Sequence, residues 1–243
     1  MTTGLRQAMG FLTPVGGPSA PSPAALAWFP VVGLGLGLGL GSVWWAGDRI
    51  WVGLVAAAVV IAADLAATGL LHLDGLVDSA DGLLPHLSTE RRLEVMRQPD
   101  AGAFGVGVAG AVLLLRWSAL AAIAPSPLLL GALWCLSRTA MAAAALRLPY
   151  ARRSGGLATS FLPVEDGRRS PVLRVAAGGV LAIPAAVAWD AVQGPAVIAA
   201  AALGTGAVLL LAHRRLGGYT GDVLGGAGMV GETCGLLAAA ATW

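Results

Sequence analysis

Apolar residues recur in seven long runs, and polar stretches rich in Gly, Pro and charged residues separate these runs. Each run approaches the ~20 residues that an α-helix needs to cross a lipid bilayer. The pattern therefore predicts about seven transmembrane helices, at residues 24–45, 51–71, 103–124, 127–146, 171–189, 195–212 and 225–243. The last run is the least regular, because it is rich in glycine and contains Glu232.

Composition strengthens this interpretation. The 243 residues are 57% hydrophobic and only 12% charged, whereas soluble domains carry about 25% charged residues. We expect one all-α, polytopic membrane bundle spanning residues 1–243, with membrane lipid as its surroundings. The net charge is only +2 and no dense basic run is present, so nucleic acid is not an expected partner. The oligomeric state stays open, a homo-oligomer included.

Arginine distribution predicts the orientation. All fifteen basic residues are arginines, and the loops that follow the second, fourth and sixth runs carry most of them. The turns at 46–50, 125–126 and 190–194 contain a single arginine, Arg49. Because basic residues concentrate on the cytoplasmic side, we expect the N-terminus inside, the C-terminus outside and an active face toward the cytoplasm. In a bacterial cell this would be the inner (cytoplasmic) membrane.

Acidic residues cluster where the second apolar run ends. Asp74, Asp78 and Asp81 are spaced i, i+4 and i+7, so a helix places them on one face. Three carboxylates on one face repel one another unless a cation lies between them, and hard divalent cations prefer oxygen ligands. The spacing favours a metal site, and Asp78 and Asp81 are also candidates for acid–base chemistry. A solvated helix end is the alternative, but no basic residue follows before Arg91.

Asp64 and His72 precede this cluster. On a continuous helix, the separation of ten positions between Asp64 and Asp74 would bring their side chains within about 80° of one another. Asp64 is therefore a further candidate metal ligand, since an acid inside an apolar run is costly and usually functional. His72 is a candidate catalytic residue, and a hydrogen-bonded histidine at the membrane interface is the alternative.

Three arginines are candidates for binding an anionic substrate. Arg97 ends a segment, 90–97, that is typical of an amphipathic helix lying along the membrane surface; a solvated charged face is the alternative. Arg138 lies inside an apolar run and needs a partner, either a substrate anion or a structural ion pair. Arg152 belongs to a basic, glycine-containing loop, 147–156, which suits anion binding or only fixes the orientation.

A glycine-rich segment, GGYTGD at 217–222, precedes the last run. Glycine permits close backbone approach, and the N–H groups at a helix N-terminus attract phosphate. Gly218 and Thr220 are therefore candidates for substrate contact. Asp222 is a candidate general base or a further metal ligand.

Glycine also recurs in the first run, where Gly33, Gly37 and Gly41 fall on one helix face. This spacing is typical of close helix–helix packing. A nucleotide-binding glycine motif is not expected, because the run lies inside a membrane span and no strand precedes it.

Clustered carboxylates suited to Mg²⁺, several arginines and a glycine-rich loop, all expected on one membrane face, together indicate phosphoryl transfer. At these residues the chain resembles the cobalamin synthase family, the adenosylcobinamide-GDP ribazoletransferases. The resemblance lies in GLLHLDGLVDSADG at 69–82, SRTAM at 137–141, YAR at 150–152 and GGYTGDVLG at 217–225.

The resemblance implies a Mg²⁺-dependent transferase that acts in the last assembly step of the cobalamin nucleotide loop. Its substrates would be adenosylcobinamide-GDP and α-ribazole or α-ribazole 5′-phosphate. Its products would be adenosylcobalamin, or the 5′-phosphate of adenosylcobalamin, and GMP. Asp74, Asp78 and Asp81 would hold metal and phosphate.

Two other functions stay open from the residues alone. A CDP-alcohol type of membrane phosphotransferase also uses helix-borne acids, but its Asp-Gly pair is followed by Ala-Arg, where this chain has Leu83 and Leu84. A cation-coupled transporter also carries intramembrane acids, but here the acids gather at one membrane face. A purely structural subunit has no use for three acids on one helix face.

Overall fold

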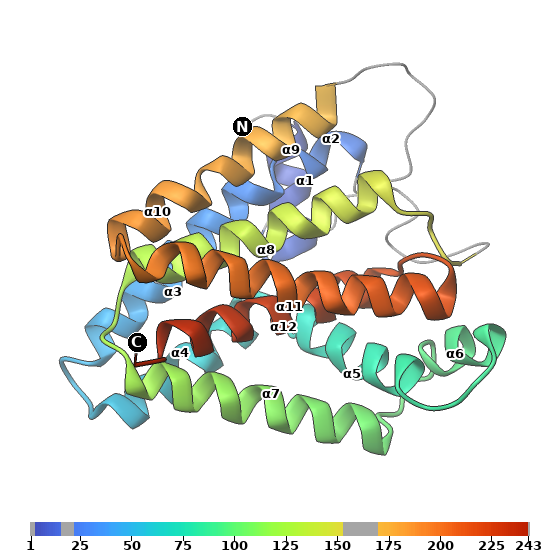
Figure 1. Cartoon of the computed structure of the whole chain (residues 1–243), viewed down its shortest axis with the longest axis horizontal. Coiled ribbons are helices and arrows are strands. Elements are labelled where there is room, and N and C mark those ends of the chain that lie inside the picture. Colours follow the sequence, from blue (N-terminus) through green and yellow to red (C-terminus); the bar gives the residue numbers. More distant parts are fainter. Residues whose placement is uncertain (1–2, 16–21, 153–169, 243) are drawn as a thin grey trace.

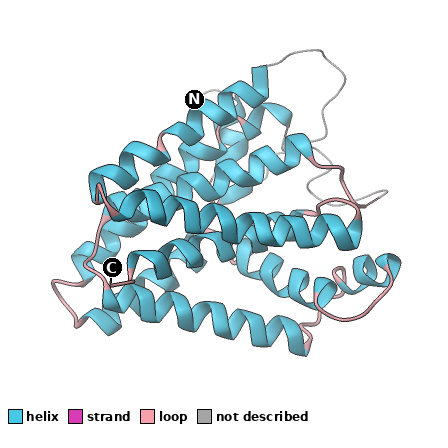
Figure 2. Cartoon of the chain, viewed as in Figure 1, coloured by secondary structure: helices cyan, strands magenta, loops and turns pink. Residues whose placement is uncertain are grey.

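The structure is a computed structural model that describes residues 3–15, 22–152 and 170–242. Over these residues the chain is helical (Figures 1 and 2), apart from loops and one isolated parallel β-bridge between Tyr150 and Tyr219. The predicted all-α fold is confirmed. The helices are α1 (Thr3–Leu12), α2 (Pro23–Leu26), α3 (Phe29–Gly47), α4 (Gly53–Ala67), α5 (Leu71–Leu83), α6 (Thr89–Val95), α7 (Ala103–Ala122), α8 (Pro127–Arg147), α9 (Ser170–Val180), α10 (Ala182–Trp189), α11 (Gln193–Leu216) and α12 (Gly221–Ala239).

Several helices have the length and apolarity of membrane spans. In the described part of the chain these are α3, α7, α8, α11 and the stretch Val172–Trp189 of α9 and α10, which makes five. α4 and α5 together make a sixth if their bent pair is one span. The chain is therefore a multi-pass membrane protein. If the bent pair counts as one span, the described residues contain one span fewer than the seven apolar runs predict.

The difference lies in α12, the helix of the last apolar run, which is not among these candidate spans. It is buried along 13 of its 19 residues, and it lies against α5, α7, α8 and α11. Figure 1 shows it in the middle of the bundle, behind α11. Glycines and polar residues are tolerated at membrane depth where protein rather than lipid surrounds them, which explains the weak apolar signal of this run.

The chain does not continue as one helix from Asp64 to Asp74. α4 ends at Ala67, and the axis of α5 is bent by 88° from that of α4. Gly69 and Leu70 between the two helices have φ of +57° and +61°. Leu70 in this left-handed conformation costs roughly 1–2 kcal/mol, so the surrounding packing must hold the bend. The bend directs α5 toward the end of the bundle and separates Asp64 from the acidic cluster.

The glycine spacing in α3 has the predicted use. A Cβ at Gly33, Gly37 or Gly41 would collide with the backbone of α8 at Trp134, Leu130 and Pro127 respectively. The two helices therefore meet backbone to backbone, as small-residue spacing allows in membranes.

The described parts of the loops predicted to face inside lie at one end of the molecule. In Figure 1, α6, the C-terminal end of α11 and the N-terminal end of α7 lie at the right, whereas the C-terminus and the α3–α4 connection lie at the left. The acidic helix α5 also runs toward the right-hand end. The helix arrangement thus brings the predicted site residues of α5, α12 and the 148–152 segment together at one end.

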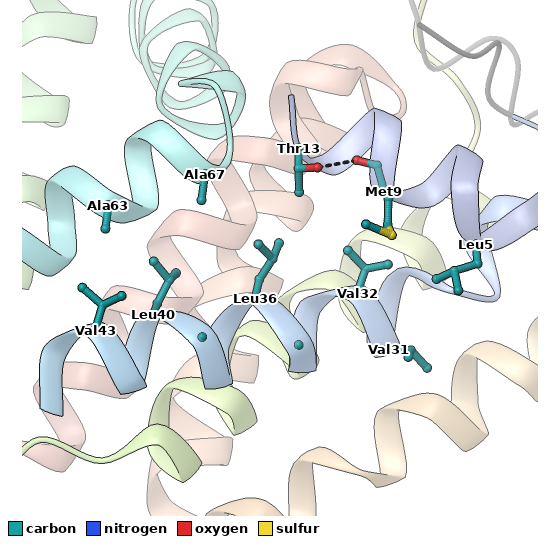
Figure 3. A pocket seen from close by; sticks show the side chains of 12 residues that line it. Leu5, Met9, Thr13, Val31, Val32, Leu36, Leu40, Val43, Ala63 and Ala67 are labelled. Carbon is teal, nitrogen blue, oxygen red and sulfur yellow. Dashed lines mark hydrogen bonds between the residues drawn. The ribbon is translucent and has the colours of Figure 1, made fainter. Parts of the chain in front are cut away.

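An apolar hollow lies elsewhere, between α1, α3 and α4 (Figure 3). It has a volume of about 570 Å³, and Met9, Leu36 and Ala63 are among the residues that line it. Its polar side chain, Thr13, bonds the Met9 carbonyl at 2.8 Å. This groove offers hydrocarbon contact and no groups for phosphate chemistry.

Candidate active site

The acidic face of α5 divides into two environments. The carboxylate of Asp81 accepts hydrogen bonds from the backbone N–H groups of Gly102, at 2.7 Å, and Gly105, at 2.9 Å. These donors begin α7, where a helix leaves N–H groups without partners and favours negative charge. Asp81 therefore anchors α7 to α5, a structural contact that its position in the sequence pattern does not reveal.

Asp74 and Asp78 lie instead with groups from other elements. Among the described residues, the strongest electrostatic interactions of Asp78 are with three acids, Asp222, Asp74 and Asp81, and with Arg152. Negative charge thus exceeds positive charge at this point. A cationic ligand, or a phosphate that brings its own cation, would relieve the repulsion.

Two segments distant in sequence hold Arg152 against Asp222. Tyr219 N–H donates to the Pro149 carbonyl and Ala151 N–H donates to the Tyr219 carbonyl, both at 2.9 Å. This short parallel pairing places the Arg152 guanidinium 2.6 Å from the Asp222 carboxylate. Arg152 also donates to the Met96 carbonyl at 3.2 Å.

Thr220 and Gly218 support this arrangement. The Thr220 hydroxyl accepts the Val223 N–H at 3.2 Å, which makes it the N-cap of α12, and it also donates to Asp222 at 3.2 Å. Gly218 lies against the Pro149 backbone, where a Cβ would collide. Both residues were candidates for substrate contact; in this structure they position Arg152 and Asp222.

A cavity of about 240 Å³ opens beside these residues. Asp74, Asp222, Arg152 and His72 contribute polar groups to its wall, and the remaining residues are Phe11, Leu71, Met141, Tyr150, Gly221, Leu224 and Gly225. His72 is 97% buried, being only 3% exposed, and neither of its ring nitrogens has a hydrogen-bond partner. A buried polar group without a partner is costly, so His72 is suited to bind a ligand group in this cavity.

Burial changes the acidity of the groups at the cavity mouth. It raises the pKa of Asp222 above its usual value, and the charge of Arg152 opposes that rise. Burial likewise raises the pKa of Tyr150. A carboxylate with a raised pKa is a better proton acceptor than an exposed one.

Asp64 and Arg138 lie in a separate buried network. Arg116 contacts Asp64 at 3.3 Å and Glu232 at 2.9 Å, and Arg138 pairs with Glu232 as well. Trp134 donates its indole N–H to Asp64 at 3.1 Å. Two acids and two arginines from α4, α7, α8 and α12 thus balance one another inside the bundle. Arg138 therefore has a structural ion-pair partner, Glu232, in this structure.

Sequence reasoning did not identify Arg116, Arg92 or Arg215 as important. Arg92 is buried and donates to the carbonyls of Gly82 and Leu83, at 2.7 and 2.9 Å, and Arg215 donates to Leu83 at 2.6 Å. The two arginines satisfy the free carbonyls at the C-terminus of α5 and favour the negative end of its dipole. In the sequence, the available signal for Arg215 was its position close to the end of a predicted helix, in what is the last turn of α11, and Arg92 had no signal beyond its positive charge.

Arg97 lies beside a second, more polar cavity of about 770 Å³. The wall of this cavity consists of Thr89, Glu90, Leu93, Glu94, Arg97, Gln98, Ala151 and Arg152. Arg152 therefore borders both polar cavities.

The donor set fits magnesium in kind but not as a preformed cage. No group of three or more His, Cys, Asp or Glu side chains is placed to hold a metal among the residues that the structure describes. Mg²⁺, however, usually takes one or two carboxylates together with substrate phosphates and water. Asp74 and Asp78 meet that requirement. Asp64 and Asp81 do not, because Arg116, Trp134 and the α7 amides already engage their oxygens.

Comparison with known proteins gives a consistent result. The family model described as cobalamin-5-phosphate synthase matches residues 4–240. An adenosylcobinamide-GDP ribazoletransferase of Chlorobaculum tepidum is 35% identical over 248 residues, covering 100% of this chain and 94% of the relative. One of Bradyrhizobium diazoefficiens is 37% identical, covering 98% and 93%. One of Syntrophobacter fumaroxidans is 37% identical, covering 96% of each chain. No solved structure matches the chain.

Proposed function

Because this chain belongs to the cobalamin-5-phosphate synthase family, it is a transferase of cobalamin biosynthesis, and we propose the reaction that it catalyses. In this proposal it transfers the adenosylcobinamide phosphate group of adenosylcobinamide-GDP to α-ribazole or α-ribazole 5′-phosphate. The relatives carry the name of this activity. The family match over residues 4–240 favours this function over the CDP-alcohol phosphotransferase and the cation-coupled transporter.

The reaction exchanges the phosphoanhydride bond of the donor for a phosphoester bond to the acceptor. A ribose hydroxyl oxygen of the acceptor forms a bond to the phosphorus that carries cobinamide. The bond from that phosphorus to the bridging oxygen breaks, and GMP leaves with the bridging oxygen and its electron pair. The hydroxyl proton passes to a carboxylate. Adenosylcobalamin, or its 5′-phosphate, is the other product.

The observation that carries the proposal is the wall of the 240 Å³ cavity, where Asp74, Asp222, Arg152 and His72 meet. Arg152 supplies a planar cation suited to phosphate. Asp222 is held by Arg152 and Thr220 and accepts the hydroxyl proton, with Asp78 as the other candidate base. His72 hydrogen-bonds the acceptor, because both its ring nitrogens lack protein partners.

Magnesium is part of this proposal. Asp74 and Asp78 would hold it, and a bound Mg²⁺ would neutralise negative charge on the phosphate oxygens. The carboxylate pair itself orients the phosphate end of the donor toward Arg152.

The site end of the bundle faces the cytoplasm in this proposal. The arginine-rich loops lie at that end, as expected for the inner side of a cytoplasmic membrane. Phosphorylated substrates, which do not cross bilayers readily, would then reach the site from the cytoplasm.

The first test is release of GMP by the purified, detergent-solubilised protein. It receives adenosylcobinamide-GDP and α-ribazole, with Mg²⁺ or with EDTA, and is compared with Asp78→Asn and with Asp48→Asn. We expect release only with both substrates and Mg²⁺, and a fall of at least about 100-fold in Asp78→Asn, the order of magnitude that one positioned acid–base group contributes.

Asp48 is the matched control, because it is an exposed aspartate next to the C-terminal end of α3, away from the site. Its asparagine variant should retain full activity. Absence of GMP release from folded wild-type protein would contradict the proposed reaction. Full activity of Asp78→Asn would remove Asp78 from the proposed site.

A further inference from the structure

The 770 Å³ cavity beside α6 has the size of a ligand-binding pocket, since such pockets generally measure roughly 300–1,000 Å³. Glu90 and Glu94 are one turn apart on α6, and Arg97 lies in the turn that follows the helix. All three contribute to the cavity wall together with Gln98. The wall thus offers acceptors, donors and a cation within one hollow.

α6 is fixed in place rather than loosely attached. Ser88 caps its N-terminus by accepting the Arg91 N–H. Arg92 is buried and holds the last carbonyls of α5, and Thr89 donates to the Arg215 carbonyl at 3.1 Å. These contacts hold the backbone of the cavity wall in place.

Arg152 connects this outer cavity with the inner cavity that contains Asp74, His72 and Asp222. Its side chain is only 10% exposed, and its Nε–H has no hydrogen-bond partner. A buried guanidinium with an unused donor, at the border of two cavities, is suited to a phosphate that has a substituent in each of them.

Phosphoryl transfer places the attacking and leaving oxygens roughly in line, on opposite sides of phosphorus. With the phosphate at Arg152, the acceptor and the leaving nucleotide must therefore occupy different cavities. The inner cavity has aromatic and aliphatic walls from Phe11, Tyr150 and Leu71, which suit the apolar benzimidazole ring of the acceptor. The outer, polar cavity is left for the nucleotide.

We infer that the cavity lined by Glu90, Glu94, Arg97 and Gln98 binds the guanine nucleotide of the phosphoryl donor and selects guanine over adenine. This inference rests on the proposed function and deepens it. Guanine presents two adjacent donors, N1–H and N2–H, to which a carboxylate offers two acceptor oxygens. Adenine presents an acceptor at N1, which a carboxylate repels.

Glu90 and Glu94 supply the carboxylates, and Arg97 lies beside them to contact phosphate. Glu94 pairs at 2.7 Å with Arg91, and both side chains are at least half exposed. Such an exposed ion pair contributes little to stability, so guanine can replace Arg91 as the partner of Glu94 at a small cost in free energy.

The experiment is equilibrium binding of GMP and of AMP to the full-length protein in detergent. The variants are Glu90→Gln with Glu94→Gln, Arg97→Gln, and Asp100→Asn as control. Asp100 is exposed and outside the cavity, so its variant removes one nearby negative charge only. We expect the wild-type protein to prefer GMP by roughly 10- to 100-fold, the discrimination of one good bidentate base contact.

The double glutamate variant should lose this preference, mainly by weaker GMP binding, whereas Asp100→Asn keeps it. Arg97→Gln should weaken GMP and AMP equally, because phosphate contacts do not distinguish bases. Equal binding of GMP and AMP by the wild type, or an unchanged preference in the double variant, would overturn the inference.

Release of GMP from adenosylcobinamide-GDP, measured on the same preparations, separates the two hypotheses. A wild type that releases GMP, combined with a double variant that still prefers guanine, refutes the guanine site and leaves the transferase function intact. A wild type that prefers GMP in a glutamate-dependent manner but catalyses no transfer supports the nucleotide site and refutes the proposed reaction.

Discussion

At the scale of single residues, Asp81 shows how one carboxylate in a metal-like pattern can serve another purpose. Its two oxygens accept the N–H groups of Gly102 and Gly105 at the start of α7. We predict that Asp81→Ala lowers the free energy of unfolding by about 1–3 kcal/mol, because the half-buried Gly102 N–H and the buried Gly105 N–H lose a charged acceptor. Thermal unfolding in detergent measures this loss as a lower Tm.

The comparison with Asp48→Ala separates the possible roles of Asp81. Asp48 is exposed, so its variant should keep the wild-type Tm. If Asp81 were instead a metal ligand, Asp81→Ala would keep its Tm in EDTA and lose only the stabilisation that added Mg²⁺ gives. That result would contradict the capping role.

At the scale of elements, the α3–α8 contact depends on glycine at successive turns of α3. A Cβ at Gly37 would collide with the backbone of Leu130 and Gly131, whereas a Cβ at Gly39 has nothing within 4 Å. We predict that Gly37→Ala destabilises the bundle by roughly 1–3 kcal/mol, because overpacking forces the two helices apart. Thermal unfolding of the purified variant measures the effect.

Gly39→Ala is a control of identical chemistry on the same helix. It should be neutral or stabilising, since alanine favours helices over glycine by about 0.5–1 kcal/mol. Equal destabilisation of both variants would mean that helix propensity or lipid contact, rather than the α3–α8 contact, governs the first span.

At the scale of the whole molecule, the network of Asp64, Arg116, Arg138 and Glu232 ties four helices together inside the bundle. Removal of one partner from a buried ion pair costs roughly 3–5 kcal/mol, because the other charge stays buried. We predict such a loss of stability for Glu232→Gln, measured as thermal unfolding in detergent.

Arg138→Gln tests the same network from its other side, and it also tests the prediction that Arg138 binds substrate. Because Arg138 pairs with Glu232, we expect a lower Tm and an unchanged KM for adenosylcobinamide-GDP in the protein that stays folded. A KM raised tenfold or more with wild-type Tm would show instead that Arg138 contacts the donor.

The α4–α5 break also belongs to this scale. Apolarity predicts one continuous span over residues 51–71, but α4 ends at Ala67. The 88° bend that follows depends on the packing that holds Leu70 in a left-handed conformation. A continuous helix through residues 68–70 would place Asp64 and Asp74 near one another. The break instead puts the two carboxylates in different environments.

The sequence by itself determined the all-α membrane class, the glycine contact of the first span, and the family. These depend on properties that a local segment carries alone: apolarity over ~20 residues, spacing of small residues, and ordered motifs. The sequence motifs also placed most of the candidate site residues in α5, the 148–152 segment and the start of α12.

Only the tertiary structure decided what each charged side chain does. Asp81 and Asp74 share one helix face, yet α7 amides hold one and a cavity receives the other. Glu232 of α12 is the partner of Arg138 and Arg116, and the pairing of Tyr150 with Tyr219 brings Arg152 to Asp222. The physical reason is that a charge in a low-dielectric bundle is governed by its nearest partner, and that partner comes from a helix distant in sequence.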